Sequence, residues 1–292
     1  MRKINTHKLP LAFVLVLIGT SVSCGSKENY VVDYDADILQ SAPDEDSESS
    51  GHRQALSEVP DVLASNATQD PETNLETVYA FSAPRDLFNG DNLDGWTNEN
   101  GGEPQGWRAE NGVLKLVDPN AARDIITSEK FGDYVFQFEW RFGRECNSGV
   151  KYKIVQPNGR GWLGLEYQIQ DDANVEDGKV PARKIASVFD VLPAQASLIS
   201  DQFPAPTGAA PEGEFRKGKI VVVGDKVEHW IDDQRVLAFT IGSKEWNDGK
   251  SNGKFKNQKE FGLVKESPIL LQAHGYPVEF RNLTIQTRKV EQ

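Results

Sequence analysis

The sequence predicts an all-β domain over residues 81–292, built as a jelly-roll β-sandwich. Three observations support this prediction. Hydrophobic residues recur with period two in many short runs, Gly and Pro mark nearly every joint between the runs, and no stretch has the periodicity of a convincing amphipathic helix. Only residues 187–199 and 243–260 could hold a short helix.

The predicted strands follow one another closely along the chain. Residues 107–116 (WRAENGVLKL) contain an Asn111-Gly112 pair between two hydrophobic runs, which predicts a tight hairpin. Residues 134–142 (YVFQFEWRF) alternate strictly, so we expect the aromatic side chains to face the core and Glu139 and Arg141 to face outward. Further strands are predicted at 149–156, 163–170, 219–224, 226–232, 235–241, 267–275 and 278–287.

Residues 1–23 are typical of a signal peptide. Three cations in the first eight residues precede an apolar run at 9–19, which is too short to span a bilayer about 30 Å thick. The run leads to SVSCG, where Cys24 has the position of the lipidated cysteine of a bacterial lipoprotein; cleavage and secretion without a lipid is the alternative. We therefore expect an exported protein at the periplasm or cell surface, attached to the membrane only through Cys24.

Residues 25–80 are predicted to form an acidic, flexible tether. They contain thirteen acids, two bases and few aromatic residues, so they cannot bury enough apolar surface to fold. The alternative is that residues 25–80 form an acidic tail that binds a partner. The remaining domain is nearly balanced in charge, which argues against a nucleic-acid partner. Lipidation of Cys24 would leave Cys146 without a partner for an internal disulfide, so the stability of the domain must come from its core.

Polar residues at alternate positions of three predicted strands suggest a site. Glu166 and Gln168 alternate with apolar residues in LGLEYQIQ (163–170), and Gln272 and His274 do so in ILLQAHG (269–275). We expect these residues to share one outward face with the polar residues of 134–142. For any one of them, a solvated surface position is the alternative, and for His274 also a histidine held by a backbone carbonyl.

These residue types suit proton transfer and sugar binding. A histidine near its ordinary pKa can move a proton or bind a metal ion, a carboxylate can act as a base, and amides can pair with sugar hydroxyls. The sequence contains no phosphate-binding loop, GxSxG, CxxC or HExxH motif. In RECNSGVKYK (144–153) we expect residues 147–149 to form a tight turn that directs the side chains of Asn147 and Lys153 to the polar face. We expect Cys146 to have no role in the site.

Seven blocks in order resemble the DUF1080 family, also called the 3-keto-disaccharide hydrolase domain. This family has a concanavalin-like or LamG-like jelly roll, and the resemblance spans nearly the whole predicted domain. The blocks are LFNGDNLDGW (87–96), WRAENGVLKL (107–116), IITSEKFGDYVFQFEWRF (125–142), NSGVKYK (147–153), GLEYQIQDD (164–172), VEHWIDDQRV (227–236) and ILLQAHGYPVEFRNLTI (269–285).

The resemblance implies a hydrolase or lyase acting on glycosides oxidised at C3. The 3-keto group acidifies the C2 proton, so a base can remove it, the glycosidic oxygen leaves C1, and water then adds back. The implied proton-transfer group is Glu166 or His274, and Glu139 is a ligand or orienting carboxylate. The implied substrate contacts are Arg141, Asn147, Lys153, Gln168 and Gln272. A bound divalent metal ion could stabilise the enolate; no other cofactor is implied.

Three departures from the family pattern leave alternatives open. Lys153 stands where the family commonly has arginine, Phe189 where it usually has tyrosine, and Ala273 where it often has an acid. The main alternative is a non-catalytic carbohydrate-binding module on the same fold. Two others are a laminarinase-type retaining glycosidase, which needs clustered acids where 134–142 supplies only Glu139, and a structural surface protein.

Overall fold

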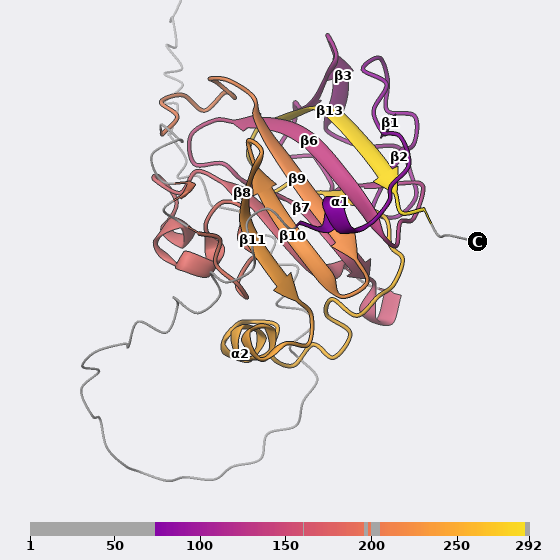
Figure 1. The fold of residues 1–292 in the computed structure, drawn as a ribbon. Helices are drawn as coiled ribbons and strands as arrows, with labels where there is room; N and C mark the ends of the chain where they lie inside the picture. Colours follow the sequence, from indigo (N-terminus) through magenta and orange to yellow (C-terminus); the bar gives the residue numbers. More distant parts are fainter. Residues whose placement is uncertain (1–73, 160, 196–197, 200–204, 290–292) are drawn as a thin grey trace, which may run out of the picture. The chain divides into compact units, whose positions relative to one another are not determined.

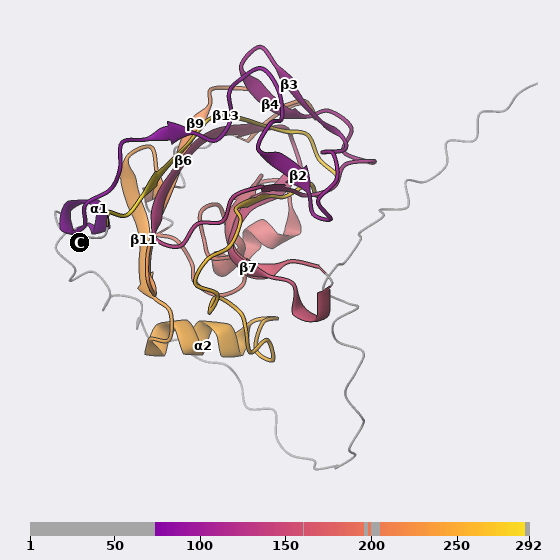
Figure 2. The same ribbon diagram turned by 90° about the vertical axis from the view of Figure 1, so that its right-hand side faces the viewer.

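The computed structural model describes residues 74–289, except 160, 196–197 and 200–204. In this part of the chain, two antiparallel sheets form the two layers of a sandwich, which confirms the all-β prediction (Figures 1 and 2). None of the helices described is long and apolar enough to cross a membrane. The predicted signal peptide, Cys24 and most of the predicted tether lie outside the described residues.

The larger sheet has eight strands. Seven follow the order β11-β10-β9-β6-β13-β4-β3, and β1 pairs with β13. The predicted hairpin at 107–116 is confirmed, with positive φ at Asn111 (54°) and Gly112 (76°), as a tight two-residue turn requires. The strands are β1 (Arg85–Asp86), β3 (Trp107–Glu110), β4 (Val113–Leu116), β6 (Tyr134–Phe142), β9 (Arg216–Val223), β10 (Lys226–Ile231), β11 (Gln234–Thr240) and β13 (Val278–Thr287).

The smaller sheet has five strands in the order β2-β5-β12-β7-β8. They are β2 (Trp96–Asn98), β5 (Ile125–Thr127), β12 (Leu270–Leu271), β7 (Asn147–Val155) and β8 (Leu163–Gln170). The expected turn at 147–149 is wrong, because β7 already begins at Asn147. The chain reverses just before it, where Cys146 N donates to Gly143 O and Glu145 has φ of 61°.

Helices are few and short. Helix α2 (Lys244–Asn252) lies inside the predicted stretch 243–260, and Ser243 caps it by accepting a hydrogen bond from Trp246 N. The described residues of 187–199 form no α-helix. Single turns of 3₁₀-helix are η3 (Pro157–Gly159), η4 (Glu176–Lys179) and η5 (Pro181–Arg183).

Helix α1 (Leu75–Val78) was not predicted and comes from the end of the expected tether. Leu75 packs with Val135, Val221 and Val223 on the outer face of the eight-stranded sheet. Figures 1 and 2 show this helix lying against that sheet. Residues 74–80 therefore belong to the folded domain, because they cover apolar side chains that would otherwise be exposed.

The core lies between the two sheets. Phe136, Phe138 and Trp140 of β6 are at most 1% exposed, as the alternation predicted. His229 of β10 is also buried there, and its ring nitrogens lie 2.7 Å from Tyr152 Oη and 2.7 Å from Ala186 O. Burial lowers the pKa of His229 to about 4, so the imidazole is neutral and acts in packing.

Candidate functional site

Polar side chains line the outer face of the five-stranded sheet. Along β8, Leu165, Tyr167 and Ile169 enter the core, so the intervening Glu166 and Gln168 take the opposite face. Both are almost fully buried, which is unusual for polar side chains on an outer face. The prediction that this strand presents its polar residues away from the core is confirmed.

Glu166 and Lys151 form the charged pair of this face. They are direct cross-strand neighbours on β8 and β7, and Lys151 Nζ lies 3.7 Å from Glu166 Oε2. The Glu166 side chain leans over Gly149, because a Cβ atom there would lie only 2.6 Å from Glu166 Oε1. Glycine at this position therefore makes room for the carboxylate.

A chain of amides continues the face beside the charged pair. Gln168 Nε2 donates to Asn147 Oδ1 at 3.0 Å and to Gln170 Oε1 at 2.8 Å. These donations fix which side-chain atom of Gln168 is the oxygen. Among the described residues, Gln168 Oε1 and Gln272 Oε1 are buried without a hydrogen-bond partner. A buried, unpaired acceptor costs roughly 1–3 kcal/mol, so each calls for an explanation.

Gln272 reaches the same face from the segment after β12. Gln272 N donates to Gly149 O at 2.9 Å, which extends the pairing of β12 with β7 by one residue. Ser148 Oγ donates to Gln272 O at 2.9 Å. His274 follows two positions later and is partly buried. The structure thus brings together four of the eight predicted site residues: Glu166, Asn147, Gln168 and Gln272.

Sequence reasoning missed two charged residues of this face, Lys151 and Asp124. Lys151 was overlooked in favour of Lys153, two positions later. Asp124 directly precedes β5, and its Oδ1 accepts a hydrogen bond from Ala273 N at 2.8 Å. Removal from water raises the pKa of Asp124 to about 6, and Lys151 opposes the rise. Its signal in the sequence was weak, because one acid before a short apolar run is common.

The expectation that Lys153 points at the polar face is wrong. A register shift interrupts the pairing of β7 with β8 after Tyr152, and Lys153 adopts a φ of 47°. Its Nζ donates to Val264 O at 3.1 Å, and burial lowers its pKa. The β-bulge therefore breaks the alternation that the prediction relied on.

Glu139 and Arg141 do not share this face either, because β6 belongs to the other sheet. Both lie on the outer face of the eight-stranded sheet and pair with β13. Glu139 accepts from Arg281 Nε at 2.6 Å, and Arg141 Nε donates to Glu279 at 2.6 Å. Alternation predicted correctly that they face outward, but it could not assign the strand to a sheet.

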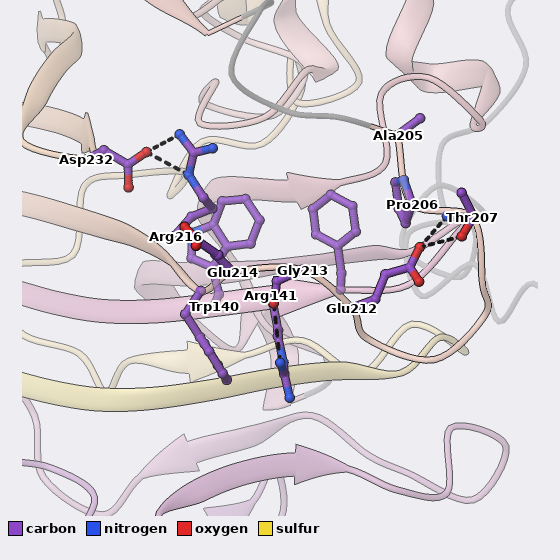
Figure 3. A pocket seen from close by; sticks show the side chains of 12 residues that line it. Trp140, Arg141, Ala205, Pro206, Thr207, Glu212, Gly213, Glu214, Arg216 and Asp232 are labelled. Atoms are coloured by element: carbon purple, nitrogen blue, oxygen red, sulfur yellow. Dashed lines mark hydrogen bonds and ion pairs between the residues drawn. The ribbon is translucent and has the colours of Figure 1, made fainter.

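A cavity of about 770 Å³ lies beside Arg141, where the segment 205–216 crosses the end of β6 (Figure 3). Trp140, Phe142 and Phe215 contribute aromatic side chains to its lining. Most of its charged groups are matched within the protein: Arg141 pairs with Glu279, Arg216 pairs with Asp232, and Glu212 accepts from Thr207 (Figure 3). We therefore place the candidate site on the five-stranded sheet, where two acceptors lack partners.

The segment 185–190 borders the site beside β8. Phe189 N donates to Glu166 O at 3.0 Å, and Ala186 N donates to Gln168 O at 2.9 Å. The Phe189 ring contacts the Lys254 ammonium, which lies 4.6 Å from the ring centroid. The tyrosine-to-phenylalanine departure thus lies next to the strand that carries Glu166.

The polar face does not supply a recognisable set of metal ligands. Within the described ranges, no group of three or more His, Cys, Asp and Glu side chains could hold a metal ion. Of the carboxylates that this face presents, Glu166 is already paired with the Lys151 ammonium.

Comparison with known families gives one match over most of this domain. A family described as the 3-keto-alpha-glucoside-1,2-lyase-like domain matches residues 83–286. The matched range contains every residue of the polar face and both sheets except Thr287, the last residue of β13.

Individual relatives agree with this match. The chain is 28% identical over 232 residues to a protein named 3-keto-disaccharide hydrolase from Bacteroides thetaiotaomicron. This alignment covers 68% of this chain and 77% of the relative. A crystal structure of a proposed glycosyl hydrolase from Parabacteroides distasonis is 25% identical, with a TM-score of 0.58, and covers 70% and 93% of the two chains. A second such structure from the same species is 20% identical, with a TM-score of 0.53 and coverage of 70% and 100%, and supports the fold alone.

Proposed function

The chain belongs to the 3-keto-alpha-glucoside-1,2-lyase-like domain family, and from this premise we propose that it cleaves 3-keto-glycosides on the outer face of its five-stranded sheet. The name of the Bacteroides relative and the glycosyl-hydrolase description of the Parabacteroides structure support a carbohydrate-active enzyme. The observation that carries the proposal is the row of groups around Gly149. A carboxylate–ammonium pair lies beside two buried amide oxygens that lack partners.

The first step needs a base at the C2 proton of the sugar. Glu166 is proposed for this role because it lies on the polar face and can take up a proton, and His274, two residues after Gln272, is the other candidate. Removing the C2 proton moves negative charge onto the C3 oxygen. The Lys151 ammonium next to Glu166 can stabilise that charge, since a preorganised cation favours a developing oxyanion.

The second step breaks the bond between C1 and the glycosidic oxygen. The electron pair of the enolate re-forms the C3 carbonyl, a double bond forms between C1 and C2, and the leaving oxygen takes up a proton. Addition of water then places a hydroxyl on C1 and a hydrogen on C2, which gives net hydrolysis. Release before the addition of water would give the lyase product instead.

The amides are proposed to hold the sugar. The Oε1 atoms of Gln168 and Gln272 can accept hydrogen bonds from sugar hydroxyls, which would satisfy both acceptors. Asn147 supports Gln168 by accepting from its Nε2 atom. A site built to pair with hydroxyls discriminates strongly against ligands that lack them.

The export of the protein is also part of the proposal. Residues 1–23 would be removed and Cys24 lipidated, so that the enzyme acts outside the cytoplasm while attached to a membrane. Replacing Cys24 with alanine should move the protein from the membrane fraction to the soluble fraction of the expressing cells. An unchanged membrane fraction would contradict the lipid anchor.

The test of the activity compares two substrates that differ only at C3. The purified protein is incubated with a 3-keto-glucoside and with its unoxidised parent, and release of the aglycone is followed. Cleavage of the keto substrate alone is the expected result. Cleavage of the parent would favour an ordinary glycosidase, and binding without turnover would favour a carbohydrate-binding module; either would overturn the proposal.

A further inference from the structure

Asp124 lies in the same row of side chains as the amides of the polar face. Strand β12 pairs Leu270 with Ile126 and Leu271 with Ile125, so the next step of this register places Gln272 opposite Asp124. Leu271 and Ile125 enter the core, so Gln272 and Asp124 take the outer face. The hydrogen bond from Ala273 N to Asp124 Oδ1 holds this arrangement at 2.8 Å.

The row runs from Asp124, just before β5, across β12 and β7 to Gln168 on β8. Gln272 N donates to Gly149 O, and Gly149 is paired with Gln168 on β8. Since adjacent strands lie about 4.8 Å apart, the Cα atoms of Asp124 and Gln168 are separated by about 14 Å. Two acidic side chains, Asp124 just before β5 and Glu166 on β8, therefore lie on the same face of the sheet, with Gln272 and Gly149 on the chain segments between them.

The two acids have different surroundings. Glu166 forms an ion pair with Lys151 at 3.7 Å. Asp124 instead lies beside Glu99, whose backbone N donates to Asp124 O at 3.2 Å. The charges that act on Asp124 are Lys151, Glu99 and Glu166, and burial together with the two acids raises its pKa to about 6. Glu166 beside a cation suits a base, and Asp124, which keeps its proton up to about pH 6, suits an acid on the same face.

We propose that Asp124 is a further catalytic residue, the acid that protonates the leaving glycosidic oxygen, and this assignment rests on the proposed function. In the step that breaks the C1–O bond, the electron pair of that bond goes to the oxygen, and the Asp124 carboxyl proton forms the new O–H bond. When water adds to C1, the Asp124 carboxylate takes the proton that the water loses, and the protonated base, after exchanging its proton with solvent, protonates C2. Both carboxyl groups then end in their starting states.

The test uses two leaving groups that differ in their need for a proton. 4-Nitrophenol leaves as a stable anion, whereas methanol must be protonated as it leaves. Asp124→Asn keeps an oxygen that can accept from Ala273 N, so the local fold is preserved, but it has no carboxyl proton to give. We expect the variant to lose about 10²–10⁴-fold in kcat/KM on the methyl 3-keto-glucoside. On the 4-nitrophenyl 3-keto-glucoside it should lose less than about tenfold.

A pH profile of the unaltered protein tests the same role without a substitution. The rate on the methyl substrate should fall as the pH rises through about 6, where Asp124 gives up its proton, and the rate on the nitrophenyl substrate should not. The role of Asp124 would be overturned if Asp124→Asn lost kcat/KM equally on both substrates or lost it on neither. Identical pH profiles on the two substrates would also overturn it. Failure of the unaltered protein to cleave either keto substrate would overturn the proposed function itself, and this role with it.

Discussion

Lys151 Nζ and Glu166 Oε2 lie 3.7 Å apart on neighbouring strands of the five-stranded sheet, with the Glu166 side chain leaning over Gly149. This pair is the only one among the described salt bridges that joins β7 to β8. It places a carboxylate and an ammonium on the face where two amide oxygens have no partner. The predictions below follow from this arrangement and from the way the core supports it.

Replacing Glu166 with glutamine should remove the base and keep the shape of the side chain. We expect kcat on a 3-keto-glucoside to fall by about 10²–10⁴-fold, while the unfolding temperature changes little. Steady-state kinetics and a thermal melt of the same preparation measure both quantities.

Glu139→Gln is the matched control for that substitution. Glu139 lies on the opposite sheet, where it accepts from Arg281 and Asn282, so its loss should leave kcat within about threefold of the unaltered value. A partly exposed ion pair contributes about 0–1 kcal/mol, so the effect on stability should also be small. Equal losses of activity in the two variants would contradict the placement of the site.

Gly149→Ala tests whether the Glu166 carboxylate must lie over β7. The new Cβ would lie 2.6 Å from Glu166 Oε1, so the carboxylate must move. A displacement of about 1 Å can cost about 10²-fold in rate, and we expect a loss of that order in kcat. The new Cβ would also lie 2.8 Å from Glu166 Cγ, so the buried side chain must shift from Cγ outward and the melting temperature should fall moderately as well.

Gly208→Ala serves as the control, since its Cβ would meet no atom closer than 3.6 Å. It should leave activity and stability unchanged. If Gly149→Ala has the activity of this control, the position of Glu166 does not matter for turnover.

His229 should make the stability of the domain depend on pH. Its pKa is about 4 in the folded state and 6.5 in the unfolded chain, so the unfolded state binds a proton first as the pH falls. The contribution to stability is complete above about pH 6.5 and is lost as the pH falls to about 4. The shift corresponds to a loss of about 3 kcal/mol in the free energy of unfolding.

Denaturant unfolding at pH 7 and pH 4.5 measures this dependence. His229→Gln should be less stable than the unaltered protein at pH 7 and should show a smaller loss on acidification. His52→Gln is the control, because His52 belongs to the predicted flexible tether and its replacement should leave the pH dependence of unfolding unchanged. The same loss in all three proteins would show that another group dominates acid unfolding.

Much of the fold could be predicted from local sequence, because alternation and turn chemistry are local properties. The aromatic face of 134–142 and the Asn111-Gly112 hairpin are confirmed for this reason. The partition of strands between sheets depends on pairing between distant segments, such as β12 with β5 and β7. The sequence pattern therefore grouped Glu139 and Arg141 with residues of the other layer.

The candidate site was predicted where strands were regular and missed where they were not. Glu166 and Gln168 follow from the alternation of β8, whereas the bulge at Lys153 turned the prediction away from Lys151. Asp124 has no local signal, since its position depends on the backbone of Ala273, far away in the sequence. Sites built across strands need the register before their members can be identified.

The central claim, that this domain cleaves its substrate by removing the C2 hydrogen, can be tested by turnover in deuterated water. A 3-keto-glucoside is cleaved by the purified protein to low conversion, and C2 of the product is examined by mass spectrometry and NMR, with a parallel sample lacking protein to measure background exchange. We predict that each released aglycone is matched by loss of the original C2 hydrogen, with deuterium at C2 of the hydrated product. Product that retains its original C2 hydrogen would contradict the claim.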